Sequence, residues 1–208
     1  MRTRRAMGAL ALGTLVVGVL REGRRRHLRF GATPDEVGAD LPGDDLIARP
    51  GLTATRAVTI AAPPQDVWPW LVQIGQQGAG FYSYEALENL FGCDIHNADR
   101  VVPEWQGTAV GDEVRLFPDG GLTVAAIEHD RALVLDGGVA VGEQPSPFSF
   151  TWAFVLRGRP DGSTRLVVRE RYGYLTRWAP LLVEPVQLAS FVMTQKMLRG
   201  IRERAERR

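Results

Sequence analysis

The sequence predicts an α+β fold in which a curved antiparallel sheet surrounds a long C-terminal helix. Apolar residues recur at every second position in a series of short segments between residues 113 and 174, as in strands with one buried face. They then recur at steps of three and four from Pro180 onward, as in a long amphipathic helix. With 208 residues, 45% of them apolar, the chain can bury one sizeable core behind an N-terminal extension. Cys93 is the only cysteine, so an intramolecular disulfide is excluded.

Residues 1–28 have the pattern of a membrane anchor. Three arginines precede an uncharged run at positions 6–20, and four more follow between Arg21 and Arg26. A helix of that run rises about 22 Å, which is shorter than a hydrocarbon core of ~30 Å. The flanking arginines favour an uncleaved anchor that holds the rest of the chain at the cytoplasmic face of the membrane. A cleaved signal peptide would need a small-residue cleavage site, which does not follow, and an amphipathic tail helix on a cytoplasmic protein is the alternative.

Residues 29–52 read as a linker with one short helix. Gly, Pro, Asp and Thr dominate this stretch, and no period of 2 or 3.6 is sustained. Thr33 followed by Pro34, Asp35 and Glu36 is a helix-start pattern, because a threonine hydroxyl caps the first turn and a glutamate three residues later can cap in return. Pro42 and the glycine after it should end the helix.

The folded domain should span residues 53–208 and begin with a strand and two short helices. The alternating, β-branched residues 55–60 predict the strand. A helix over 66–74 follows, shortened or bent by Pro69. A second helix is expected over 83–91, with Ser83 as its N-cap and Gly92 just past its end.

The remaining strands are expected to form hairpins, and the last element is the long helix. Turn sequences at 118–121 and 159–162 contain Pro, Asp and Gly, whose backbone preferences suit tight turns. Strands are expected at 113–117, 122–128, 132–135, 148–156 and 165–174. The helix should cover residues 180–208, and Pro185 should restrict its regular part to about Glu184 onward.

The charge distribution argues against nucleic acid as a partner. Residues 1–29 contain eight arginines and one glutamate, and residues 199–208 contain five arginines and two glutamates. Between them, residues 30–198 contain 12 basic and 21 acidic residues, a net charge of −9. A domain of that sign repels phosphate backbones, whereas its basic ends can contact an anionic membrane surface.

The order strand, two short helices, antiparallel strands and long helix resembles that of the SRPBCC superfamily, which includes START/Bet v 1-like, polyketide cyclase-like and lipid-transfer members. The resemblance is most specific in residues 62–106 (APPQDVWPWLVQIGQQGAGFYSYEALENLFGCDIHNADRVVPEWQ), which are similar to an uncharacterised bacterial subgroup, as are residues 29–47. It implies a helix-grip fold, in which the helices hold a curved sheet around a cavity for an apolar ligand. It implies no shared set of catalytic residues.

The aromatic residues indicate where such a cavity would lie. They concentrate on the two short helices and the last two strands, where Phe148, Phe150, Trp152 and Phe154 share one sheet face. Each could simply fill the core, but aromatic walls with a few polar groups are typical of small-molecule pockets. The predicted ligand-binding residues are Trp70, Gln73, Tyr82, Tyr84, Phe150, Trp152, Glu170, Tyr172 and Met193.

His96 and Asp99 are the candidate catalytic residues. An imidazole near a carboxylate can transfer protons near neutral pH. A structural polar network is the stronger interpretation of these two residues, because no second histidine has metal-ligand spacing. No metal or other cofactor is therefore expected.

Two functions follow from these observations. The first is binding or carriage of a hydrophobic, lipid- or polyketide-like small molecule in an internal cavity. The alternative is a cyclase- or aromatase-type enzyme acting on a bound polyketide-like substrate, and it would be favoured if His96 faced the cavity. A non-catalytic structural role is a third interpretation.

Overall fold

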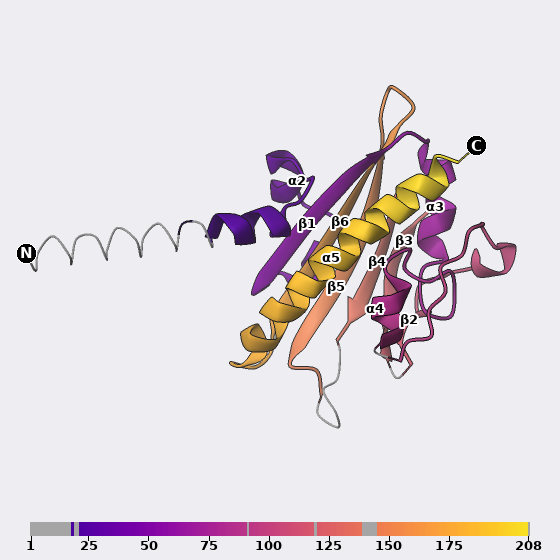
Figure 1. The fold of residues 1–208 in the computed structure, drawn as a ribbon. Helices are drawn as coiled ribbons and strands as arrows, with labels where there is room; N and C mark the ends of the chain where they lie inside the picture. Colours follow the sequence, from indigo (N-terminus) through magenta and orange to yellow (C-terminus); the bar gives the residue numbers. More distant parts are fainter. Residues whose placement is uncertain (1–17, 19–20, 91, 119, 139–144, 208) are drawn as a thin grey trace, which may run out of the picture.

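A computed structural model describes residue 18 and residues 21–90, 92–118, 120–138 and 145–207, which fold around one six-stranded antiparallel sheet (Figure 1). Its strand order is β1-β6-β5-β4-β3-β2, so the first strand pairs with the last. The strands are β1 (Leu52–Ile60), β2 (Glu113–Phe117), β3 (Gly120–Glu128), β4 (Ala132–Gly137), β5 (Phe148–Gly158) and β6 (Thr164–Tyr174). The predicted α+β class and antiparallel hairpins are confirmed.

The long helix α5 (Ala179–Ala205) crosses one face of this sheet (Figure 1). Side chains alternate along β6, so Glu170 and Tyr172 face α5, while Arg169 and Arg171 face the other side. The prediction that Pro185 limits the regular helix was wrong, because Pro185 lies inside a helix that begins six residues earlier. Pro185 is exposed, so water can hydrogen-bond to the backbone carbonyl that the proline leaves unpaired.

Two short helices lie between β1 and β2. α3 (Pro64–Val72) contains both Pro64, in its first turn, and Pro69. α4 (Glu85–Leu90) starts two residues after Ser83, and the prediction that Ser83 caps it was wrong. The Ser83 hydroxyl donates instead to the carbonyl of Met193 on α5, at 3.1 Å, and so ties the start of α4 to the long helix.

Residues 31–47 pack against the face of the sheet opposite α5. Helix α2 (Pro34–Gly38) has the predicted capping box, with Thr33 and Glu36 each bonding the other's backbone N–H. A short 3₁₀ helix, η1 (Asp44–Ile47), follows. Ion pairs join this segment to β6, because Glu36 binds Arg165 at 2.7 Å and Asp44 binds Arg171 at 2.9 Å.

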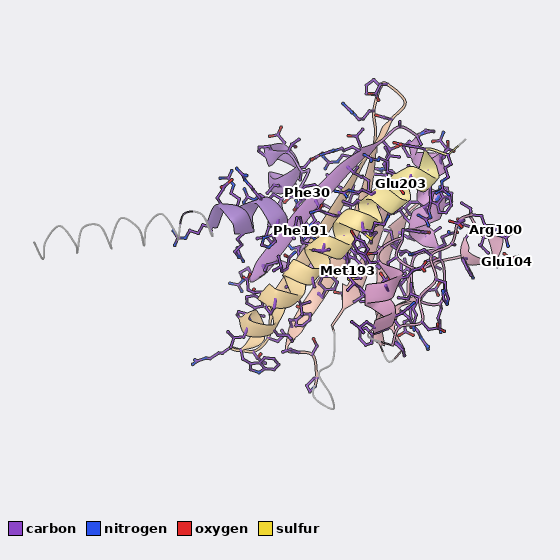
Figure 2. The ribbon with its side chains drawn as sticks, in the orientation of Figure 1. Phe30, Arg100, Glu104, Phe191, Met193 and Glu203 are labelled. Atoms are coloured by element: carbon purple, nitrogen blue, oxygen red, sulfur yellow. The ribbon has the colours of Figure 1, made fainter. Side chains whose placement is uncertain are left out.

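Helical residues 21–28 contact the outer side of α5. Arg24 pairs with Glu184 at 2.6 Å, and the His27 ring lies 5.6 Å from that of Phe191. Phe30 also packs against Phe191, and both are labelled in Figure 2. Apart from Gly18, the apolar run at 6–20 that was predicted as a membrane anchor lies outside the described residues. Within the described residues, no helix combines the length and the apolarity that a membrane span requires.

Candidate functional site

A cavity of about 520 Å³ lies between the sheet, α4 and α5. This volume falls within the usual range of small-molecule sites, roughly 300–1,000 Å³. Its wall is mostly apolar, and it includes Phe81, Leu87, Cys93, Leu116, Phe117, Phe148, Phe150, Trp152, Tyr172, Val186, Ala189, Met193 and Met197. Ser83, Glu88, Glu170, Ser190 and Thr194 are its polar members.

Aromatic rings from the last two strands form one side of the cavity. Phe148, Phe150 and Trp152 project from alternate positions of β5, as the sequence pattern predicts. The Phe150 and Tyr172 ring centroids lie 4.7 Å apart across β5 and β6, and Phe81 lies 6.3 Å from Trp152. These rings make a wall that a ligand can contact at little entropic cost, because aromatic side chains have few rotatable bonds.

The cavity reaches the surface between α4 and the first half of α5. Three of its lining residues there are exposed, namely Leu87 on α4, and Val186 and Ala189 on α5. Met193 lies one turn further along α5, beside α4 in Figure 2. The entrance is therefore bordered by apolar side chains, which suits the passage of an apolar molecule.

Glu170 places a buried charge in the cavity wall, and Arg56 on β1 neutralises it. Arg56 Nη1 lies 2.7 Å from Glu170 Oε1, and both side chains are almost completely buried. The guanidinium also lies 5.5 Å from the centroid of the Phe191 ring and donates to the His27 carbonyl. A buried carboxylate needs such a partner, because removing an isolated charge from water is very unfavourable.

Hydroxyl groups saturate the rest of the Glu170 carboxylate. Ser190 donates to it at 2.9 Å, Thr194 at 3.2 Å and Tyr172 at 3.1 Å. Burial, with the negative charge of Glu170, raises the pKa of Tyr172 well above its ordinary value. The phenol is therefore neutral and keeps its proton on the hydrogen bond to Glu170.

Glu88 is the second carboxyl group in the wall, and it has no such partners. Its side chain is 4% exposed, and neither oxygen has a hydrogen-bond partner among the described residues. Burial, followed by the nearby Glu85 carboxylate, raises the pKa of Glu88 to about 7. Burial also raises the pKa of the neighbouring Cys93 thiol, and Glu88 adds to that shift. Glu88 thus has hydrogen-bonding capacity that the described protein groups leave unused.

Five of the nine residues predicted to bind a ligand line the cavity: Phe150, Trp152, Glu170, Tyr172 and Met193. Gln73 instead has its amide engaged within the protein, donating to the Tyr82 hydroxyl at 3.0 Å and accepting from the Val102 N–H at 3.1 Å. The Tyr82 hydroxyl donates to the Trp70 carbonyl, so these three residues form a buried cluster beside α3.

Tyr84, the remaining predicted residue, is 42% exposed and does not contribute to the cavity. Gln73 also borders a smaller, more polar hollow of about 330 Å³, which lies near the start of β2. The polar groups around that hollow include Asp112, Glu113 and Arg115.

His96 and Asp99 lie outside the cavity and point to different partners. The His96 side chain is 78% exposed, and its Nε2 lies 3.4 Å from Asp94. Asp99 is 84% exposed and lies 3.6 Å from Arg204 near the end of α5. Within the described part of the chain, no group of three His, Cys, Asp or Glu side chains is placed to hold a metal ion.

The sequence interpretation missed Arg56, Glu88, Ser190 and Thr194. Arg56 could have been found, because it occupies the apolar face of an alternating strand, where a lone charge calls for a buried partner. Glu88 lies four residues after Tyr84 on a short helix, within its apolar stripe. Ser190 and Thr194 carry no such signal, because small hydroxyl residues are common on any helix.

The sequence matches no known protein-family model and no curated protein. Solved structures nevertheless share its architecture. The hypothetical protein jhp0584 from Helicobacter pylori aligns with a TM-score of 0.51 at 13% identity, over 80% of this chain and 95% of that one. This similarity concerns the fold alone.

Two further structures are more distant. Protein MLL2253 from Mesorhizobium loti has a TM-score of 0.45 at 18% identity, covering 72% of this chain and 96% of its own. DynU16, a protein of the dynemicin biosynthetic locus, has a TM-score of 0.41 at 13% identity, covering 71% of this chain and 46% of its own.

Proposed function

We propose that this protein binds or carries a hydrophobic small molecule, lipid- or polyketide-like, in the cavity between α4, α5 and the sheet. The observation that carries the proposal is the cavity itself, about 520 Å³ in volume with a predominantly apolar wall and an apolar entrance. Natural cores are close-packed, so an apolar hollow of this size is unusual unless something occupies it.

We also infer that the fold is a helix-grip domain of the SRPBCC type. A curved antiparallel sheet packs around a long C-terminal helix, and two short helices follow the first strand. The ligand position expected for that fold, between the helix and the sheet, coincides with the cavity. The sequence resemblance in residues 62–106 supports the same assignment.

The residues of the cavity wall favour ligand binding over catalysis. None of the described lining residues is a histidine, and the candidate acid–base pair His96 and Asp99 lies on the exposed surface. A cyclase- or aromatase-type enzyme would need a proton donor or acceptor beside the substrate. Cavity carboxyls Glu170 and Glu88 are the groups on which that alternative would rest.

A substitution at the entrance tests the binding proposal. Ala189→Trp should cover the mouth and reduce the affinity for a neutral apolar fluorophore, N-phenyl-1-naphthylamine, by roughly tenfold or more, since the ring occupies the route into the cavity. Ala189 is exposed, so stability should change by no more than about 0.5 kcal/mol. Fluorescence titration measures the affinity and urea denaturation measures the stability.

Leu188→Trp is the matched control, because Leu188 is exposed on the same helix but does not line the cavity. It should bind the fluorophore like the unmodified protein. Equal binding by all three proteins would contradict the proposal. Native mass spectrometry of protein purified from its own host would identify a co-purified apolar molecule.

We also propose that the basic N-terminal segment tethers this domain to the cytoplasmic face of a membrane. The support is that helical residues 21–28 lie against α5, and that the first half of α5 and the turn before it carry exposed apolar residues. Leu175, Trp178, Leu181 and Leu188 are the most exposed of these. Arginines beside an exposed apolar surface are typical of segments that contact anionic lipid.

A further inference from the structure

Glu88 and the groups around the cavity restrict the chemistry of the ligand. The cavity wall is mostly apolar, so the few polar groups in it decide which ligand group is tolerated there. The preference described below rests on the proposed binding function.

The hydroxyl groups of the wall are already engaged. Ser83 donates to the Met193 carbonyl at 3.1 Å, and Tyr172, Ser190 and Thr194 each donate to Glu170. A hydroxyl has one proton to donate, so none of these four can donate to a ligand without giving up its present bond. An anionic or carbonyl-bearing ligand would therefore compete with the protein for its donors.

The charges of the wall are unfavourable for an anion as well. Among the described lining residues there is no Lys, Arg or His, and the Arg56 guanidinium behind the wall is paired with Glu170 at 2.7 Å. Glu88 is a second carboxyl in the same wall, with Glu85 near it on the same helix. A bound carboxylate would meet two acidic groups and no free cation.

We propose that the cavity selects an apolar molecule carrying a basic nitrogen, whose ammonium group is bound by the Glu88 carboxylate. Both Glu88 oxygens lack a described partner, so an ammonium group there would make charge-assisted hydrogen bonds without displacing any existing one. Glu88 already lines the cavity, and Leu87 beside it belongs to the exposed entrance. The same charges disfavour fatty-acid anions.

This arrangement couples binding to pH. The pKa of Glu88 without a ligand is raised to about 7 by burial, so the carboxyl is half protonated near neutral pH. The amine binds the ionised form, and its affinity should fall as the pH drops below about 7. The other titratable groups close to Glu88 are Glu85 on α4 and the Cys93 thiol after it, and Glu170 and Tyr172 on β6 line the same cavity.

Three ligands with the same alkyl chain test the proposal, namely dodecylamine, dodecanol and dodecanoate, each used below its micelle concentration. They compete with N-phenyl-1-naphthylamine for the unmodified protein at about pH 8. The amine should displace the fluorophore at a concentration roughly tenfold lower than the alcohol, because its ammonium group makes charge-assisted hydrogen bonds to Glu88 that a neutral hydroxyl does not. Dodecanoate should be the weakest. The amine preference should shrink at about pH 5.5, where Glu88 is protonated.

Glu88→Gln should abolish the preference for the amine while retaining fluorophore and dodecanol binding. Glu203→Gln is the matched control, an exposed Glu near the end of α5 and outside the cavity (Figure 2), and it should behave like the unmodified protein. An amine preference that is absent, or that persists in Glu88→Gln, overturns the proposal. If Glu88→Gln does not fold, a pH-independent amine affinity of the unmodified protein overturns it equally. Failure of the fluorophore and all three ligands to bind would instead refute the cavity function itself.

Discussion

Arg56 and Glu170 lie on the adjacent strands β1 and β6 and form an ion pair under the long helix. Burying two charges is unfavourable unless the geometry is close and the remaining hydrogen-bonding positions are filled. Here the carboxylate also accepts from Ser190, Thr194 and Tyr172, so each of its oxygens is satisfied. The cluster therefore fixes α5 over the sheet at a defined position, beside the cavity.

Removing one partner of this pair should destabilise the protein far more than replacing both. Glu170→Ala leaves the Arg56 charge buried and unpaired, and we expect the free energy of unfolding to fall by about 3–5 kcal/mol. The double variant Arg56→Met, Glu170→Leu leaves no charge and should lose less than Glu170→Ala alone. Urea denaturation measures both. A loss below about 1 kcal/mol for Glu170→Ala would show that the pair is not buried in solution.

Glu88 should make stability depend on pH. Its pKa is raised from 4.5 to about 7 in the folded protein, so between these values the unfolded chain releases a proton that the folded protein keeps. Folding is then disfavoured as the pH rises from about 4.5 to 7, by up to about 3 kcal/mol, with no further change above that range. Glu88→Gln has no titratable group at this position, so this pH dependence is absent from the variant. Its stability relative to the unmodified protein should rise between about pH 4 and pH 8 in urea denaturation, and a constant difference would contradict the expected pKa.

At the scale of elements, α5 approaches the loop between α3 and α4 through a glycine. A Cβ atom at Gly200 would lie 2.4 Å from the Tyr82 carbonyl oxygen and 2.8 Å from the Tyr82 Cβ. The two backbones can approach this closely only because Gly200 has no side chain. The buried Trp70, Gln73 and Tyr82 cluster thereby lies directly against the long helix.

Gly200→Ala should therefore destabilise the protein by about 1–3 kcal/mol, although alanine has the better helix propensity by about 1 kcal/mol. Gly23→Ala is the matched control, because Gly23 is also helical and a Cβ there would meet no atom within 4 Å. That substitution should be neutral or stabilising. Thermal unfolding compares the two, and equal effects would show that the contact between α5 and Tyr82 is loose.

Most helices and strands could be predicted from the local sequence pattern. The errors occurred where a tertiary contact determines the role of a residue or the start of an element. The period of 2 predicts β2, β5 and β6 to within a residue or two. Ser83 has the chemistry of an N-cap but bonds α5 instead, and only the fold brings the Met193 carbonyl within reach. β1 begins at Leu52, three residues earlier than predicted, because Leu52 pairs with Tyr172 on a strand far along the chain.

At the scale of the whole molecule, the aromatic side of the cavity could be predicted from the sequence, but its polar side could not. Phe150, Trp152 and Tyr172 share a sheet face by simple alternation, so they could be predicted to lie together. Arg56, the partner of Glu170 on β1, is 114 residues away in the sequence, and Ser190, a partner on α5, is 20 residues away. No local sequence pattern relates Glu170 to either of these partners. His96 and Asp99 are close in sequence but point to separate partners on the surface.

The proposed membrane tether is tested on the full chain. A tagged protein should fractionate with membranes, and deletion of residues 1–26 should release it, since the apolar run and its flanking arginines are then absent. Circular dichroism of the deleted form checks that the sheet is retained. A full-length protein that remains in the supernatant would refute the tether.

The pairing of β1 with β6 has a consequence for synthesis of the chain. Thr55 and Arg169 are 114 residues apart, yet they lie on neighbouring strands. At roughly 5–20 residues per second, a ribosome takes about 6–23 s to make the strand that β1 requires. During that interval the nascent chain presents an apolar, β-branched segment without its sheet neighbour, the kind of surface that chaperones recognise and that aggregates when they are scarce.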